Sequence, residues 1–562
     1  MKRLSLIVAI AALTSSTWLH AGQPANSAIT EAAMAGDTAA VKRLLKEGAD
    51  ANTASPDGMT PLHWAAMKGV PDLAQALLVS GANIEAKTRL GAFTPLHLAS
   101  QAGHAMVIAH LIASGAKVDA TTATGATALM HAASSGNAQA VTMLIENGAK
   151  TDATESANGQ TALMFAAALN RAEATQALLT RAANPSATSK VVNLAALTAS
   201  DDSSTQSPPP GVPAPAARPA QAEVPGLTRA FNYNELIGQV GGLSALHFAA
   251  RQGAADVVKV LVEGGAKANL PSAGDGTSPV LIAVINGHFD IARYLLEHGA
   301  DASAANAAGV TPLYAAVNLQ WAPKSFYPQP RAYLQQHTGY LELMTMLLDK
   351  GADPNARVNR KTWFTQYNFD LLRVDDGGAT PFWRAAYASD LEAMKLLVAR
   401  GADPFIPTAK PAGNNRPQQG GTRSESDVTV PLPPLPTGGP AITALHAAAG
   451  VGFGEGFAGN AHRAAPTGMV AAVKYLVEEL GLDVNAVDDD GNTAVHHAAS
   501  RGDNEMILYL VSKGADVKRV NRIGQTTVDL ANGPVQRTQP FPETIKLLES
   551  LGAKNNNKCV SC

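Results

Sequence analysis

The stretch TPLHWAAMKG, residues 60–69, decides the fold of this chain, because close variants of it return at regular intervals. TPLHLASQAG begins at Thr94, TALMHAASSG at Thr127 and TALMFAAALN at Thr161, so the first four copies start 34, 33 and 34 residues apart. Further copies begin at Ser244, Ser278, Thr311, Thr380, Thr443, Thr493 and Thr527. A period of this length, kept over most of 562 residues, predicts a repeat protein rather than one hydrophobic core.

Each copy has the chemistry of a helix–turn–helix unit. Thr60 is a good helix N-cap, and Pro61 suits the first helical position, where no backbone N–H is needed. Gly69 can end this first helix in the left-handed conformation. The stretch from Asp72 to Gly81 places leucines and alanines at helical spacing and predicts a second helix. One such unit cannot bury its own apolar face, so the units must stack on one another.

The period of about 33 residues and the T-P-L-H-x-A pattern resemble the ankyrin repeat. The resemblance covers most of residues 26–554 and implies an all-α solenoid of about twelve helix–turn–helix units, joined by inter-repeat turns or hairpins. It also implies a structural role for the motif residues, with the histidine hydrogen-bonded within the turn network. These residues are Thr60, Pro61, His63, Thr94, Pro95, His97, His131, His247, His446 and His496.

Low-complexity segments divide the repeats into three blocks. The N-terminal repeats occupy residues 26–187, the central repeats 241–405 and the C-terminal repeats 441–554. The segments between them, 188–240 and 406–440, are rich in Pro, Gly and Ser and are poorly suited to burying a core. Each is a linker or a loop: it either separates two sub-arrays or loops out of a continuous solenoid, and we favour the second.

Longer insertions also interrupt the repeats at 318–339, 357–378 and 450–467, and the first two are rich in aromatic residues. Trp, Tyr and Arg are the usual anchors of protein interfaces, which suggests a binding surface at the two aromatic insertions. The alternative is that these two insertions pack against each other as a small local core. The binding hypothesis names Trp321, Tyr327, Trp363, Phe364 and Tyr367.

The family resemblance implies a scaffold that binds another protein, and not an enzyme. In such a solenoid the turns and first helices present one concave face to the partner. Candidate contacts on this face are Trp64, Lys68, Trp383 and Arg384, the two tryptophans being expected to be exposed there. The partner is an unidentified protein, and the chain itself is expected to be a monomer.

The composition and the motifs of the sequence argue against several other classes of function. A formal net charge of −3 offers no basic excess for nucleic acid. No P-loop or nucleophile elbow is present, and we expect neither a cofactor nor a metal. Histidines at equivalent positions of stacked repeats lie about 10 Å apart, too far to share one zinc ion. We expect the acidic run Asp488–Asp490 to be a solvated turn, and the second histidine of the pair His496–His497 to have no metal role.

The N-terminus, MKRLSLIVAIAALTSSTWLHAG, has the features of an export signal. Lys2 and Arg3 precede a short apolar run, and Leu19-x-Ala21 is a plausible cleavage site. Residues 1–21 are therefore expected to be a signal peptide, and the mature chain to be periplasmic or extracellular. The apolar run is shorter than the roughly 18 residues that a membrane span needs, so no integral membrane segment is expected after signal removal.

The polar tail 555–562 carries Cys559 and Cys562, the only cysteines of the chain. It lacks the histidine of a haem-attachment motif and the βαβ context of a thioredoxin-like dithiol. Three interpretations stay open: a local disulfide or reducible tail, intermolecular pairing through a disulfide or a metal, and a docking point for a redox partner. The third gives an alternative function, an accessory subunit of an exported redox or haem system that acts through this C-x-x-C pair.

Overall fold

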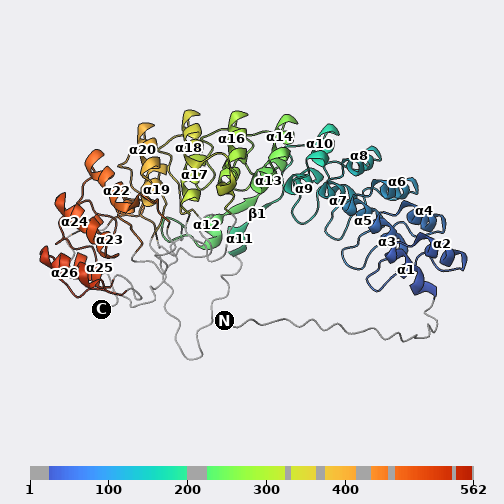
Figure 1. Cartoon of the computed structure of the whole chain (residues 1–562), viewed down its shortest axis with the longest axis horizontal. Helices are drawn as coiled ribbons and strands as arrows, with labels where there is room; N and C mark the ends of the chain where they lie inside the picture. The colour runs from blue at the N-terminus through green and yellow to red at the C-terminus, as the bar shows by residue number, and fades with distance from the viewer. Residues whose placement is uncertain are drawn as a thin grey trace, which may run out of the picture. The chain divides into compact units, whose positions relative to one another are not determined.

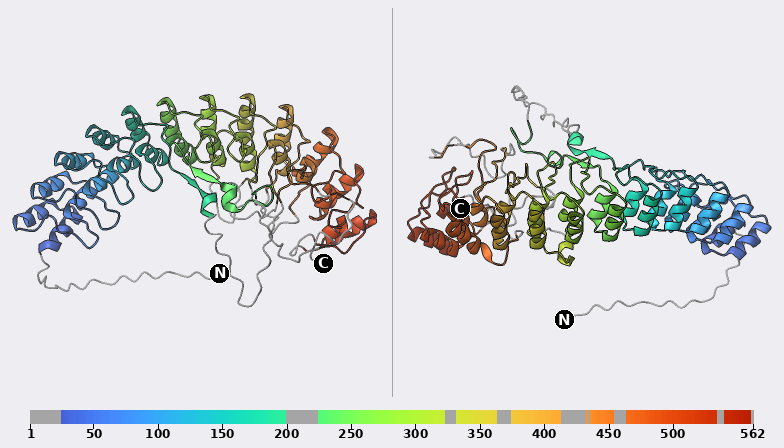
Figure 2. Two further views of the ribbon diagram at one scale, coloured as in Figure 1. Left: turned by 180° about the vertical axis from the view of Figure 1, so that it is seen from behind. Right: turned by 90° about the horizontal axis from the view of Figure 1, so that it is seen from above.

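The computed structural model describes residues 25–198, 224–322, 331–362, 374–412, 432–433, 435–453, 463–533 and 539–559. The chain divides into two compact units, residues 1–157 and 158–562. Each unit is a stack of short antiparallel helix pairs (Figure 1 and Figure 2). Among the described residues, none of the helices combines the length and the hydrophobicity of a membrane span.

The described part of the first unit contains four helix pairs. The first helices contact one another along the stack, and so do the second helices. The pairs are α1 (Ala25–Ala35) with α2 (Thr38–Lys46), α3 (Pro61–Lys68) with α4 (Pro71–Val79), α5 (Pro95–Ala102) with α6 (Ala105–Ala113), and α7 (Ala128–Ser135) with α8 (Ala138–Glu146).

The second unit continues the same architecture with eight pairs in its described residues, so the predicted all-α solenoid of about twelve units is confirmed. The first four pairs are α9 (Ala162–Ala168) with α10 (Ala172–Thr180), α13 (Ala245–Gln252) with α14 (Ala255–Glu263), α15 (Pro279–Ile285) with α16 (Phe289–Glu297), and α17 (Pro312–Gln320) with α18 (Tyr340–Asp349). The last four are α19 (Pro381–Tyr387) with α20 (Leu391–Ala399), α21 (Ala444–Ala448) with α22 (Gly468–Lys474), α23 (Ala494–Ala499) with α24 (Asn504–Ser512), and α25 (Thr527–Asn532) with α26 (Pro542–Ser550).

The ends of the helices follow the local chemistry of the repeat. Thr60 has extended backbone angles at the N-cap of α3, and Pro61 opens the helix. Gly69 ends it with a φ of 70°, a left-handed conformation that a residue with a Cβ rarely adopts. Ala65 and Ala66 are fully buried, because their small side chains let neighbouring helices approach closely.

The first low-complexity segment leaves the stack and returns to it at one place. Strand β1 (Val191–Asn193) pairs antiparallel with β2 (Gln239–Gly241), and α9 packs directly on α13. The described ends of the segment also form α11 (Leu194–Thr198) and α12 (Tyr233–Ile237). The repeats on either side of the segment are therefore stacked directly on each other, and its described ends carry more regular structure than their composition suggests.

The second low-complexity segment also leaves the stack intact. Thr408 N–H donates to the Ile442 carbonyl at 3.0 Å, and Ala441 N–H donates to the Thr408 carbonyl at 2.9 Å. These bonds close the inter-repeat turn on either side of the segment, and α19 packs on α21.

The chain end forms part of the C-terminal cap. In the last repeat, TTVD replaces TPLH, so Asp529 stands where the motif has histidine. The buried Asp529 carboxylate accepts hydrogen bonds from the Thr526 hydroxyl and backbone N–H, and from the backbone N–H groups of Asn556 and Lys558 at 3.2 and 3.1 Å. The tail thus occupies the place that the turn of a following repeat would take.

We expect Asp529→Ala to loosen the last repeat, because it leaves the buried Thr526 N–H and the part-buried N–H groups of Asn556 and Lys558 without an acceptor. Such losses cost about 2 kcal/mol, and in a repeat array the effect stays local. Hydrogen exchange of the α25 and α26 amides should accelerate about tenfold or more. The matched control is Glu549→Ala, which removes an exposed carboxylate from α26. Equal exchange in both variants would contradict the anchoring role of Asp529.

Candidate functional site

In several repeats the third residue of the first helix, a position here called the histidine slot, is bonded to the turn of the next repeat. In α3 the Nδ1 of His63 lies 3.1 Å from the Thr60 backbone nitrogen and 2.9 Å from the Thr60 hydroxyl. Its Nε2 lies 3.0 Å from the Phe93 carbonyl oxygen of the following turn. The same bridge is made by His97 to Ala120, His247 to Thr277 and His446 to Ala486.

The bridge fixes the protonation state of these histidines. Because Nδ1 accepts the Thr60 backbone N–H, the single ring proton of His63 resides on Nε2 and is donated to the carbonyl. A second proton on Nδ1 would face an N–H donor. Burial lowers the pKa of His247, His446 and His496 to about 4, so these rings stay neutral at pH 7.

Other residues fill the slot elsewhere: Leu281 in α15 has no donor, but Tyr314 and Trp383 do. Tyr314 donates its hydroxyl to Asp376 Oδ2 at 2.8 Å, and Trp383 donates its indole N–H to the Ile442 carbonyl at 2.9 Å. Both donate to a group in the following turn, as the histidines do. The expectation that Trp383 is an exposed contact residue is therefore wrong: it occupies the histidine slot and is 1% exposed.

His131 lies one position beyond the slot, although its sequence context suggests a motif histidine. Met130 occupies the slot, and its sulfur lies 3.4 Å from the Thr127 backbone nitrogen. The His131 ring instead packs against the rings of His97 and Phe93, with centroids 5.8 and 5.5 Å away. The predicted role of His131 in the turn network is therefore corrected, since its place is in side-chain packing.

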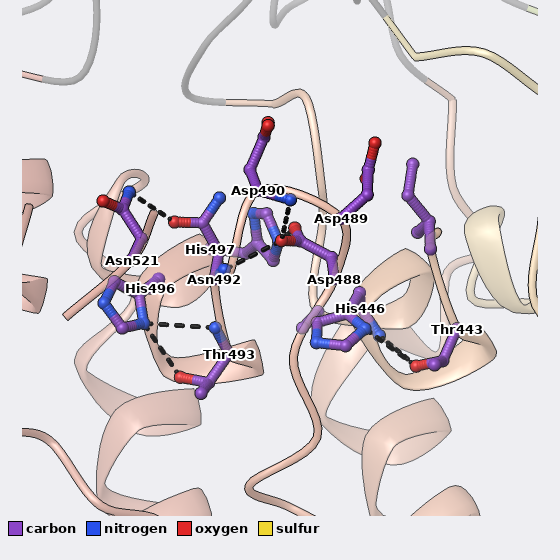
Figure 3. A network of polar contacts seen from close by, with 12 residues as sticks. Thr443, His446, Asp488, Asp489, Asp490, Asn492, Thr493, His496, His497 and Asn521 are labelled. Carbon is purple, nitrogen blue, oxygen red and sulfur yellow. Dashed lines mark hydrogen bonds and ion pairs between the residues drawn. The ribbon is translucent and has the colours of Figure 1, made fainter. Parts of the chain in front are cut away.

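His497 also follows the slot, and it pairs with the acidic run (Figure 3). Its Nε2 lies 2.9 Å from Asp488 Oδ2, and both side chains are buried. Asp488 also accepts the backbone N–H groups of Asp490 and Asn492 at 3.0 and 2.8 Å. The expectation of a fully solvated turn is thus wrong for Asp488. An extra histidine one residue after the slot is the sequence signal for this pair.

Arg384 is likewise buried, against the prediction that it contacts a partner. Its Nε donates to Asn318 Oδ1 at 2.6 Å, and its Nη2 donates to the Trp321 carbonyl at 2.9 Å. The equivalent position in α3 is the half-buried Trp64, which lies beside no such insertion. The start of the 318–339 insertion covers Arg384, and this is why it is only 4% exposed.

Trp321 is held in the same polar cluster. Its indole N–H donates to Asp390 Oδ2 at 2.7 Å, and the Tyr340 hydroxyl donates to the same oxygen at 2.9 Å. Arg463, from the 450–467 insertion, lies over the Trp321 ring and donates to the Tyr333 hydroxyl at 2.9 Å. Among the described residues, the insertion at 318–339 therefore packs with 450–467. Tyr327, Trp363, Phe364 and Tyr367 lie outside the described residues.

A hollow of about 290 Å³ lies in the first unit, between α1, the turn at 53–56 and Trp64. The Trp64 indole N–H is buried and has no hydrogen-bond partner among the residues described. Met34 lines the hollow and is 48% exposed, while Lys68 is exposed one turn further along α3. Sequence reasoning singled out Trp64 and Lys68 but missed Met34, which lies outside the TPLH motif.

Cys559 lies against the last repeat, with its Sγ 3.7 Å from Asn532 Nδ2. Cys559 is 8% exposed and takes part in a disulfide, and Cys562 is the only other cysteine in the chain. The Lys558 carbonyl beside it accepts a hydrogen bond from Gln525 Nε2 at 3.0 Å. Of the three open interpretations, this arrangement favours the local disulfide. In the described part of the chain, no group of three or more His, Cys, Asp or Glu side chains could hold a metal.

The family models that match this chain are all models of ankyrin repeats. The profile described as ankyrin repeats (3 copies) matches residues 29–122, 96–189 and 246–323. Ankyrin repeats (many copies) matches 461–511, and ankyrin repeat matches 377–409. Together these regions cover more than half of the 562 residues.

Curated relatives are similar over short stretches. Protein phosphatase 1 regulatory subunit 12A of Mus musculus is 41% identical over 71 residues, 13% of this chain and 7% of that protein. Palmitoyltransferase AKR1 of Saccharomyces cerevisiae is 43% identical over 60 residues, 11% of this chain and 8% of that protein. Ankyrin repeat and SAM domain-containing protein 6 of Danio rerio is 28% identical over 171 residues, 28% of this chain and 21% of that protein. The chain thus spans only a small part of these three relatives.

The buried histidines make stability depend on pH. Their folded pKa of about 4 lies below the ordinary value of 6.5, so between these values the unfolded chain binds more protons. Stability should be fully present above pH 6.5 and decrease as the pH falls towards 4. The urea midpoint should therefore be lower at pH 4.5 than at pH 7. His247→Gln, which cannot titrate, should show a smaller decrease. An unchanged or higher midpoint at pH 4.5 would refute this.

Proposed function

The chain belongs to the ankyrin-repeat family, and from this we propose that it is a non-catalytic scaffold that binds a partner protein. The proposal draws on the family, whose stacked repeats present extended surfaces for recognition. It also draws on the chemistry of the slots, where the histidines serve the turn network and are neutral and buried. The name palmitoyltransferase belongs to a relative of which this chain matches 8%, and it carries no activity over to this chain.

We place the partner's contact in the first unit, at the hollow beside Trp64. The single observation that carries this is the buried, unpartnered Trp64 indole N–H at a hollow lined by a half-exposed methionine. A ligand carbonyl entering the hollow could accept that N–H, and its side chain could pack on Met34. Lys68 adds a charge at the rim. Tryptophan and methionine are also among the side chains enriched in the centres of protein interfaces.

In the second unit, the side chains at the predicted contact positions are less available to a partner. Trp383 and Arg384 are used internally, and Trp321 is half-buried with its N–H bonded to Asp390. The partner-binding role of Trp321, Tyr327, Trp363, Phe364 and Tyr367 remains part of the proposal, as a second contact region that a partner could reach.

We also propose that the protein is exported. The support is the positive start at Lys2 and Arg3, the short apolar run after it, and the cleavage pattern ending at Ala21. Helix α1 begins at Ala25, so cleavage there would leave the first repeat whole.

The redox alternative finds no specific support in the tail. Cys559 is buried and already in a disulfide, whereas a docking thiol needs to be accessible to its partner. The neighbouring backbone N–H groups are bound to Asp529, which gives the tail a structural use.

Trp64→Ala and Lys68→Glu should each weaken partner binding about tenfold or more, the loss typical of an interface anchor. The tagged mature protein would first capture its partner from the producing cells, and affinity would then be measured with the purified pair. Lys42→Glu is the matched control, since it reverses an exposed charge on α2. Thermal melting would verify the fold of Trp64→Ala. Unchanged affinity in both α3 variants would reject the hollow as the contact.

The export proposal predicts a mature chain that begins at Gly22. Intact-mass analysis of protein from a fractionated producing cell should find this species outside the cytoplasm. Replacing Ile7 and Val8 by Arg should interrupt the apolar run and keep the full-length chain inside. Cytoplasmic recovery of the uncleaved wild-type chain would disprove the proposal.

A further inference from the structure

The end of the second low-complexity segment lies across the turns of the repeats that follow it. The Leu432 side chain packs on Gly491, where an added Cβ would lie 2.9 Å from Leu432 Cδ1. The Pro433 carbonyl accepts a hydrogen bond from the Arg522 guanidinium. The Leu435 carbonyl accepts one from Lys410 Nζ at 3.1 Å. Three successive turns thus contact one stretch of chain.

These contacts define a turn surface made of Lys410, Asp489, Gly491 and Arg522. Arg522 is held in place there, because its Nε donates to the Asp489 carbonyl at 2.8 Å and its backbone N–H donates to the Asp490 carbonyl at 2.8 Å. Gly491 has a φ of 83°, and its missing side chain leaves the room that Leu432 takes. Asp489, Gly491 and Arg522 are therefore positioned by the repeats, while the backbone of Lys410 is held by bonds to Gly438 and Gly439.

The turn from which the segment departs is closed by residues on either side of it. The hydrogen bonds between Thr408 and residues 441–442 already close the turn from which the segment departs. Pro433 and Pro436 are exposed, and Leu432 and Leu435 are half-buried. The segment thus lies on the surface of the stack, in the manner of a bound peptide, instead of filling its core.

The chemistry of the segment matches that of the surface. The sequence VPLPPLP, residues 430–436, has no charge and four prolines. Prolines lack a backbone N–H, so such a segment offers carbonyl acceptors in excess of donors. The surface supplies two cationic donors, Arg522 and Lys410, to carbonyls two residues apart. Proline-rich segments also lose little conformational entropy on binding, because they favour an extended conformation when free.

We propose that the turn surface is a docking site for an extended, uncharged, Pro- and Leu-rich segment of a partner protein. The chain's own residues Leu432, Pro433 and Leu435 occupy this site in cis and shield it. The inference rests on the proposed scaffold function, and it names the class of segment that the C-terminal repeats take.

Tethering explains how the site is shielded. A segment joined to its own site has an effective concentration in the millimolar range, so a weak contact keeps the site largely filled. A free peptide of the same sequence must displace the tethered segment, and this lowers the apparent affinity of the free peptide. Removing the contacts made in cis should therefore raise the affinity for a free peptide.

The test uses a fluorescent peptide, VPLPPLP, and fluorescence polarisation with the full-length chain. In the open variant, Leu432, Pro433, Leu435 and Pro436 are all replaced by glycine. We expect the open variant to bind the peptide at least about tenfold more tightly than the native chain. Adding Arg522→Ala or Lys410→Ala to the open variant should remove this gain. Arg519→Ala, an exposed arginine in the same inter-repeat region, is the matched control and should leave the gain intact.

Several outcomes overturn the proposal. One is equal peptide affinity of the native chain and the open variant. Another is an open variant whose peptide affinity is unchanged by Arg522→Ala and by Lys410→Ala, when thermal melting shows that these variants are folded. Absence of binding by a folded open variant also overturns it. Trp64→Ala in the open variant should not alter peptide affinity. If the peptide test fails while partner capture still depends on Trp64, only this inference is rejected. If the peptide binds as expected while partner capture does not depend on Trp64, only the contact at the hollow is rejected.

Discussion

The structure depends on one interaction, the hydrogen bond from the histidine slot of one repeat to the turn of the next. Stacked apolar faces alone would allow helix pairs to slide, because hydrophobic burial has no direction. The slot adds a directional contact: His63 is fixed to its own N-cap at Nδ1 and reaches the Phe93 carbonyl with Nε2. Tyr314 and Trp383 reach the following turn with other donors, whereas Leu281 cannot, so the directional contact is made in many of the repeats but not in all of them.

In the last repeat the slot makes the same kind of contact, but its side chain accepts hydrogen bonds and does not donate one. This repeat is followed by no further repeat turn among the described residues, and the tail that lies there offers backbone N–H groups where the other turns offer carbonyls. An acceptor is then required in the slot, and Asp529 supplies it to Asn556 and Lys558. The disulfide of Cys559 lies at the end of this docked tail. Cys559 therefore belongs to the segment that Asp529 anchors against the last repeat.

The repeat period and the helix-end signals predicted the fold, since each depends on residues close in sequence. Thr60, Pro61 and Gly69 could be assigned on local chemistry alone. The exposure of the residue after the slot could not, because it depends on what lies beside that residue in the folded stack. Trp64 is half-buried beside a hollow, His497 meets a buried Asp488, and Arg384 lies beneath Asn318 and the Trp321 carbonyl. Aligning Trp383 with His63 would have predicted its burial.

Insertions therefore change which surfaces of the stack can bind. Where an insertion lies over the first helices, as at Arg384, a position that could face a partner becomes part of the core. Where a segment lies only on the turns, as Leu432 and Pro433 do, the surface keeps its shape and is filled by a replaceable ligand. The distinction is one of burial: displacing the first kind would open part of the core and break the hydrogen bonds of Arg384, while displacing the second only returns the half-buried Arg522 to water. Recognition in this chain is thus best sought at Trp64 and at the C-terminal turns.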